Sequence, residues 1–135
     1  MEVKFRKPEF RLVNPSKAWA QISAYLDVSI KTRTEQGLDA DGNSFARYSS
    51  TYLNYRRKHG GSEIVNLTSV GYPSAHMMQS MKLLRRTEKD MEFGLTGEAA
   101  VKGFKVENTK KRIFLAMNEK DQKNILDILV KNIEL

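Results

Sequence analysis

The residue types that most often carry catalysis or bind metals are sparse in this sequence. There are two histidines, His59 and His76, and no cysteine. Neither histidine has a second histidine or a carboxylate at the offset of a known metal motif, and without cysteine no thiol chemistry is available. The glycine-rich nucleotide-binding motifs and the Gly-x-Ser-x-Gly motif are also absent. We therefore predict that the protein is not an enzyme and that it uses no cofactor.

A pair of aspartates, Asp39 and Asp41, suggests a calcium-binding loop. The spacing does not fit an EF-hand that begins at Asp39, because Ser44 takes the glycine position and Ser50 takes the position of the terminal glutamate. Residues 38–43 are instead dense in turn-forming residues. We interpret them as a tight turn and predict no metal site.

Basic residues give the strongest remaining signal. The net charge is +7, and positive charge gathers in residues 47–59, which contain no acid, in residues 82–89 and in residues 102–112. Such segments bind phosphates if they converge in space, and they are ordinary solvated surface if they do not. The candidate phosphate contacts are Arg47, Arg56, Arg57, Lys58, Lys110, Lys111 and Arg112.

Aromatic residues are interleaved with the arginines of the first basic segment. Phe45, Tyr48, Tyr52 and Tyr55 have a spacing that suits two structures. One is a short helix packed against a sheet, and the other is a surface that stacks nucleobases. We favour packing in the core and keep nucleobase stacking as the alternative.

Length and composition predict a single domain over residues 1–135. The chain has a mass of 15.5 kDa, and 40% of its residues are hydrophobic, which supports a modest core. No apolar run approaches the roughly 18 to 20 residues of a membrane-spanning helix, and the N-terminus lacks the apolar stretch of a signal peptide. We expect the protein to stay in the compartment where it is made, without a membrane partner.

Three helices can be placed from the sequence. The first begins at the cap and proline of residues 14–16 and runs to about Thr34. A short one of two or three turns lies within residues 50–61, with a serine cap, basic residues in its last turn and glycines beyond it. The last starts at Glu119, with Asn118 as its N-cap and Asp121 three residues later. The expected buried faces carry Trp19, Ile22, Leu26 and Ile30 in the first helix and Ile125, Ile128, Leu129 and Ile133 in the last. Because residues 112–135 are the most apolar segment, we expect the rest of the domain to pack on them.

The remaining segments predict a small sheet. Residues 82–87 and 91–96 read as a β-hairpin, and residues 1–13 read as an edge strand or an arm that orders against a neighbour. Residues 64–68 are expected to be extended, and residues 97–111 to form a long basic loop. The fold class is therefore α+β, with long N-terminal and C-terminal helices packed on a small antiparallel sheet and a long flexible loop.

Three segments of the chain resemble the phage virion morphogenesis family, the tail-completion or neck proteins of tailed bacteriophages. Residues 37–49, followed by Tyr52 and basic residues, are similar to the family's Asp-x-x-Gly-x-x-Trp-x-x-Leu-Ser pattern. Residues 75–81 resemble Gly-x-Leu-x-x-Ser-Ile, and residues 112–118 with Asp121 resemble Arg-Pro-Phe-Leu-Gly-Leu-Ser and a later aspartate. The order and spacing of these segments cover most of the chain from about residue 15 onward.

The resemblance implies a structural protein of the virion head–tail junction, assembled in the host cytoplasm as a homo-oligomeric ring. The implied partners are other neck proteins on the adaptor or stopper side, the tail terminator or tail tube, and genomic DNA in the lumen through non-specific contact. The expected subunit-interface residues, in the arm and the loop, are Phe5, Phe10, Phe104 and Val106. The alternative function is a basic nucleic-acid-binding module that contacts phosphates, and an enzyme is the third.

Overall fold

The computed structural model describes residues 3–6, 11–61, 65, 77–108 and 112–133. The elements follow one another as β1 (Val3–Arg6), α1 (Pro15–Glu35), α2 (Ser50–Lys58), the 3-10 helix η2 (Met77–Ser80), β2 (Lys82–Arg86), β3 (Asp90–Gly94), α3 (Gly97–Asn108) and α4 (Glu119–Lys131). This is the α+β class that the sequence predicts. No helix among the described residues is both long and apolar enough to cross a membrane.

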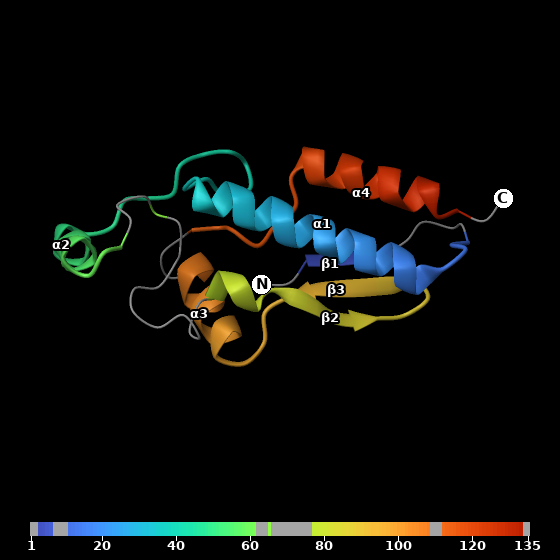
Figure 1. Cartoon of the computed structure of the whole chain (residues 1–135), viewed down its shortest axis with the longest axis horizontal. Coiled ribbons are helices and arrows are strands. Elements are labelled where there is room, and N and C mark those ends of the chain that lie inside the picture. Colours follow the sequence, from blue (N-terminus) through green and yellow to red (C-terminus); the bar gives the residue numbers. More distant parts are fainter. Residues whose placement is uncertain (1–2, 7–10, 62–64, 66–76, 109–111, 134–135) are drawn as a thin grey trace.

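Helix α1 lies at the centre of the fold, between α4 and the sheet (Figure 1). Asn14 caps it by accepting a hydrogen bond from the main-chain N–H of Lys17 (3.1 Å). Trp19 is fully buried, and its indole Nε1 donates a hydrogen bond to the carbonyl oxygen of Thr87 (2.7 Å) in the turn between β2 and β3. The predicted start and end of this helix are confirmed. The expectation that residues 112–135 organise the domain is wrong, because α1 is the element that contacts both α4 and the sheet.

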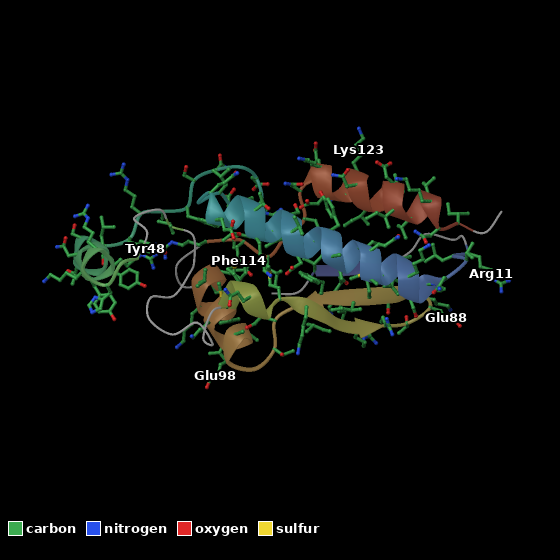
Figure 2. The ribbon with its side chains drawn as sticks, in the orientation of Figure 1. Arg11, Tyr48, Glu88, Glu98, Phe114 and Lys123 are labelled. Atoms are coloured by element: carbon green, nitrogen blue, oxygen red, sulfur yellow. The ribbon has the colours of Figure 1, made fainter. Side chains whose placement is uncertain are left out.

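Helix α4 packs antiparallel to α1. Its capping box is formed as predicted, since the Asn118 side chain accepts from the N–H of Asp121 (2.8 Å) and the Asp121 carboxylate accepts from the N–H of Asn118 (3.1 Å). Past its other end, Asn132 donates to Gln21 near the start of α1 (3.0 Å). The segment before α4 buries the Phe114 side chain in the body beneath α1 (Figure 2).

The sheet has three antiparallel strands in the order β1-β3-β2. Strands β2 and β3 form the predicted hairpin, and β1 is the predicted edge strand. In β3, Met91 and Phe93 are buried on one face while Glu92 between them is half-buried, which is the alternation of a half-buried strand. Of the segment expected to be extended over residues 64–68, only Val65 is among the described residues, and it is buried.

Residues 97–108 form helix α3, which corrects the expectation of a long flexible loop over residues 97–111. The segment from Glu98 to Lys102 is rich in strong helix formers, and Glu98 lies in the first turn, where it favours the helix dipole. Gly97 at the first position has a φ of 60°, which glycine adopts without strain, and Gly103 inside the helix lowers the helix propensity by about 1 kcal/mol. Packing compensates for this, because Gly103 is buried and α3 contacts η2. Residues 109–111 lie outside the described part of the chain.

Candidate functional site

Helix α2 stands at one end of the molecule, away from the sheet and the α1–α4 pair (Figure 1). The side chain of Ser49 caps it by accepting from the N–H of Tyr52 (3.2 Å). Its last turn carries Arg56, Arg57 and Lys58, where positive charge is favoured by the helix dipole. This is the short helix predicted within residues 50–61, and it covers Ser50–Lys58.

The tyrosines of α2 are exposed, contrary to the expectation that they pack the helix against the sheet. Tyr52 is 39% exposed and Tyr55 is 48% exposed, whereas Phe45 is buried and Tyr48 is half-buried against the core. The Tyr52 and Tyr55 rings stack with centroids 6.1 Å apart, and Tyr55 stacks on His59 at 4.1 Å. The segment before α2 carries the helix away from the sheet, so these rings pack on one another.

Two guanidinium groups hold the base of α2. The Cζ atom of Arg56 lies 4.9 Å from the centroid of the Tyr48 ring, and that of Arg112 lies 5.3 Å from it. Arg112 also donates from Nε and Nη2 to the carbonyl oxygen of Ala46 (3.2 and 3.1 Å) and from Nη2 to that of Arg47 (3.3 Å). These cation–π contacts and hydrogen bonds join the segment before α4 to the base of α2.

Exposure divides the predicted phosphate contacts. Arg47, Arg57 and Lys58 are exposed, in α2 or just before it. Arg56 is only 1% exposed, and its guanidinium is held over the rings of Tyr48 and Tyr52. This burial does not favour the predicted phosphate contact, and we reassign Arg56 to the packing of α2.

The other predicted phosphate contacts lie ahead of α4. Arg112 is half-buried and joins the base of α2, so its guanidinium is largely used within the protein. Lys110 and Lys111 lie outside the described residues. The structure therefore brings Arg112 close to Arg47 and Arg56, but only Arg47 of these three is exposed.

The predicted interface residues also differ in exposure. Phe104 on α3 is 56% exposed, and Val101 one turn earlier is 57% exposed. Val106 is half-buried against the core, which corrects its placement on an open loop. The main chain of Phe5 pairs with Met91 in the sheet, and the Phe5 side chain lies outside the described part of the structure, as does Phe10.

A buried polar cluster joins α1 to α4 and was not predicted from the sequence. The Oδ1 atom of Asp121 accepts hydrogen bonds from the hydroxyls of Tyr25 (2.9 Å) and Ser29 (2.6 Å). Its Oδ2 atom accepts from the Nη1 of Arg33 (2.7 Å) and from the N–H of Asn118 (3.1 Å). The signal was present in the sequence, because Arg33 continues the buried stripe of α1 and Asp121 begins that of α4.

Hydrogen bonds decide the charge state of this cluster. Burial by itself raises the pKa of Asp121, but the hydrogen bonds from Ser29, Asn118, Arg33 and Tyr25 stabilise the carboxylate more strongly, so its pKa lies below the ordinary 3.8. A carboxylate with four donors and a lowered pKa is poorly suited to accept a substrate proton. We interpret the cluster as structural.

A second buried acid, Glu107, lies near the end of α3. It is 8% exposed, and among the described residues its Oε1 atom has no hydrogen-bond partner. Because burial disfavours the charged form, it raises the pKa of the Glu107 carboxyl above the ordinary 4.5. We therefore expect Glu107 to couple the stability of the fold to pH.

The remaining candidate residues that the structure describes do not come together as a catalytic or metal-binding site. The Oδ1 atom of Asp39 accepts from the N–H groups of Asp41 and Asn43 (both 2.9 Å), which forms the predicted tight turn with Gly42 at φ 85°. In the described part of the chain, no three His, Cys, Asp or Glu side chains gather as metal ligands. His76 lies outside it. A groove of about 450 Å³ between α1 and the start of α4 is lined by neither histidine nor carboxylate.

Comparisons of the chain with models of protein families, with curated proteins and with solved structures found no match. Two kinds of feature stand out among the described residues: exposed apolar pairs on helices, and the exposed aromatic and basic surface of α2.

Proposed function

We propose that this protein is a structural subunit of a tailed-phage virion, a tail-completion or neck protein that joins the tail to the DNA-filled head as part of a homo-oligomeric ring. The resemblance of residues 37–49, 75–81 and 112–118 to that family supports the proposal. The α+β fold agrees with the architecture that the resemblance implies. In such a ring the subunit works by contact with its neighbours and performs no turnover.

The observation that carries the proposal is a pair of exposed apolar surfaces on different sides of the molecule. Val101 and Phe104 lie on one face of α3, and Leu126 (51% exposed) and Val130 (58% exposed) lie on one face of α4. Helix α4 lies along one side of the body and α3 along the other (Figure 1). Figure 2 marks these two sides by Lys123 of α4 and Glu98 of α3.

Two unlike surfaces are what a closed ring requires of its subunits. A head-to-tail contact uses a different patch on each partner, and it generates a ring when the rotation between neighbours closes. Apolar side chains exposed singly are ordinary on monomers, whereas pairs on one helix face make contiguous surface. We assign the α3 pair and the α4 pair to the two sides of one repeated subunit contact.

The test is the mass of the purified full chain by light scattering across concentration, for the native protein and for two variants. We expect the native chain to form a ring-sized oligomer, and Phe104→Ser and Leu126→Ser each to be monomeric. Because each variant keeps one intact surface, mixing the two should give a dimer that cannot grow. Val28→Ser, at a 64% exposed position of α1, is the matched control and should assemble normally.

Two results contradict this proposal. A native chain that stays monomeric up to concentrations of about 1 mM would exclude self-assembly into a ring. Full assembly of both variants would show that the two apolar pairs are not the contact.

The alternative, a free nucleic-acid-binding module, is favoured by the exposed basic residues of α2. It predicts a monomer or dimer that binds DNA at micromolar concentration or tighter in physiological salt.

A further inference from the structure

We propose that α2 binds duplex nucleic acid through the phosphate backbone, and that its tyrosines order the helix instead of stacking on unpaired bases. The proposal goes beyond ring assembly, because it assigns a ligand and a binding mode to one element. It rests on the geometry of α2 alone. It therefore stands or fails separately from the oligomeric state.

The charge of α2 suits a polyanion. Residues 47–59 contain no acid, and Arg47, Arg57 and Lys58 within them are exposed. Since α2 stands off the body, these cations lie on a part of the molecule that a long ligand can approach (Figure 1). Phosphate contacts of this kind position a protein on nucleic acid without reading its sequence.

The aromatic geometry argues against single strands. Tyr55 has Tyr52 one turn before it and His59 one turn after it, with interplanar angles of 14° and 26°, and its ring stacks closely on His59 with centroids 4.1 Å apart. Tyr52 is also contacted edge-on by Tyr48, with ring centroids 5.0 Å apart. A nucleobase that stacked on either ring would compete with these contacts within the helix, which makes the tyrosines poor platforms for single strands.

The stacked rings instead fix the basic side chains in place. A nine-residue helix is too short to be stable by itself, and α2 buries little apolar surface. The ladder of Tyr52, Tyr55 and His59 adds packing within the helix, and a ring nitrogen of His59 is 2.8 Å from the carbonyl oxygen of Tyr55. An ordered α2 presents Arg57 and Lys58 at fixed positions.

The experiment titrates the full chain into a labelled 20-bp duplex and into a 20-nucleotide oligothymidylate, at several salt concentrations. We expect the duplex to bind at least about fivefold more tightly than the single strand. Three phosphate contacts predict a slope of about −3 in a plot of log K against log salt. The triple variant Arg47→Gln, Arg57→Gln, Lys58→Gln should lose at least about tenfold in duplex affinity at low salt.

The matched control removes the same charge from another surface. Lys120, Lys123 and Lys131 are exposed on α4, and their replacement by Gln should change duplex affinity by less than about twofold. Circular dichroism checks that both triple variants are folded. An equal loss in the control, a preference for the single strand, or no duplex binding at low salt would each overturn the proposal. The last result would assign α2 to an acidic protein partner. Light scattering on the same samples reports the ring independently.

Discussion

The guanidinium of Arg33 and the carboxylate of Asp121 form an ion pair of 2.7 Å between α1 and the first turn of α4, and their side chains are 10% and 1% exposed. Arg33 also donates from Nη2 to the carbonyl oxygens of Phe114 and Ala116. One side chain thus satisfies buried acceptors on the segment before α4 and in the helix itself. We expect this pair to fix the position of α4 on α1.

Replacing Arg33 tests that role. Arg33→Met leaves Asp121 without its cationic partner in the core, and breaking a buried pair from one side typically costs about 3–5 kcal/mol. Urea denaturation should show a loss of that size in the free energy of unfolding. The control is Lys31→Met, because Lys31 forms a partly exposed pair with Asp27 (3.0 Å), and its loss should cost less than about 1 kcal/mol. Equal effects of the two variants would refute the assignment.

Acid should weaken the fold through Asp121. Its folded pKa is lower than the unfolded value of about 3.8, so the folded state binds fewer protons and the carboxylate contributes stability above that pH. This contribution is lost as the pH falls through the folded pKa. In Asp121→Asn the stability at neutral pH should be lower, and the decline below about pH 4 should be shallower. Unfolding curves from pH 2 to pH 7 measure both, and parallel curves for the two proteins would contradict the prediction.

Glu107 should act with the opposite sign. Its folded pKa is raised above the unfolded value of about 4.5, so the folded state binds more protons and stability falls as the pH rises from 4.5 through the folded pKa. Glu107→Gln removes the charge, and we expect it to stabilise the protein by about 1 kcal/mol at pH 7, in the range for a buried polar group without a partner. At pH 4 it should have little effect. A variant that is less stable at pH 7 would show that the carboxylate has a stabilising partner.

The contact between Arg112 and Tyr48 should hold α2 in place. Arg112→Met removes hydrogen bonds to Ala46 and Arg47 as well as the cation over the ring. We expect chymotrypsin to cleave after the exposed Tyr52 and Tyr55 at least about fivefold faster, while global stability falls by about 1–2 kcal/mol. Arg85→Met, which breaks an exposed contact with Glu92 (3.3 Å), is the control and should leave the cleavage rate unchanged. Unaltered cleavage in Arg112→Met would mean that α2 is held by other contacts.

Local chemistry explains which elements could be predicted from the sequence. The starts of α1 and α4 follow from the predicted caps Asn14 and Asn118, and α2 starts at a serine cap, Ser49, one residue before the predicted stretch; such caps need only a few neighbouring residues to form. The hairpin and the buried alternation of Met91 and Phe93 are equally local. Helix α3 was missed because its glycines favour a loop in isolation, and packing against η2 outweighs that preference only in the folded chain.

The sequence by itself determined helices α1, α2 and α4, the hairpin, the α+β class and the basic character of residues 47–59. Only the tertiary structure decided which of those side chains face solvent. It buried Arg56 and exposed Tyr52 and Tyr55, and it brought Arg112 against Tyr48 at the base of α2, 64 positions apart in the numbering. The pairing of Arg33 with Asp121 has the same origin. Each lies on a buried stripe that is visible in the sequence, but the packing of α4 on α1 selects the partner.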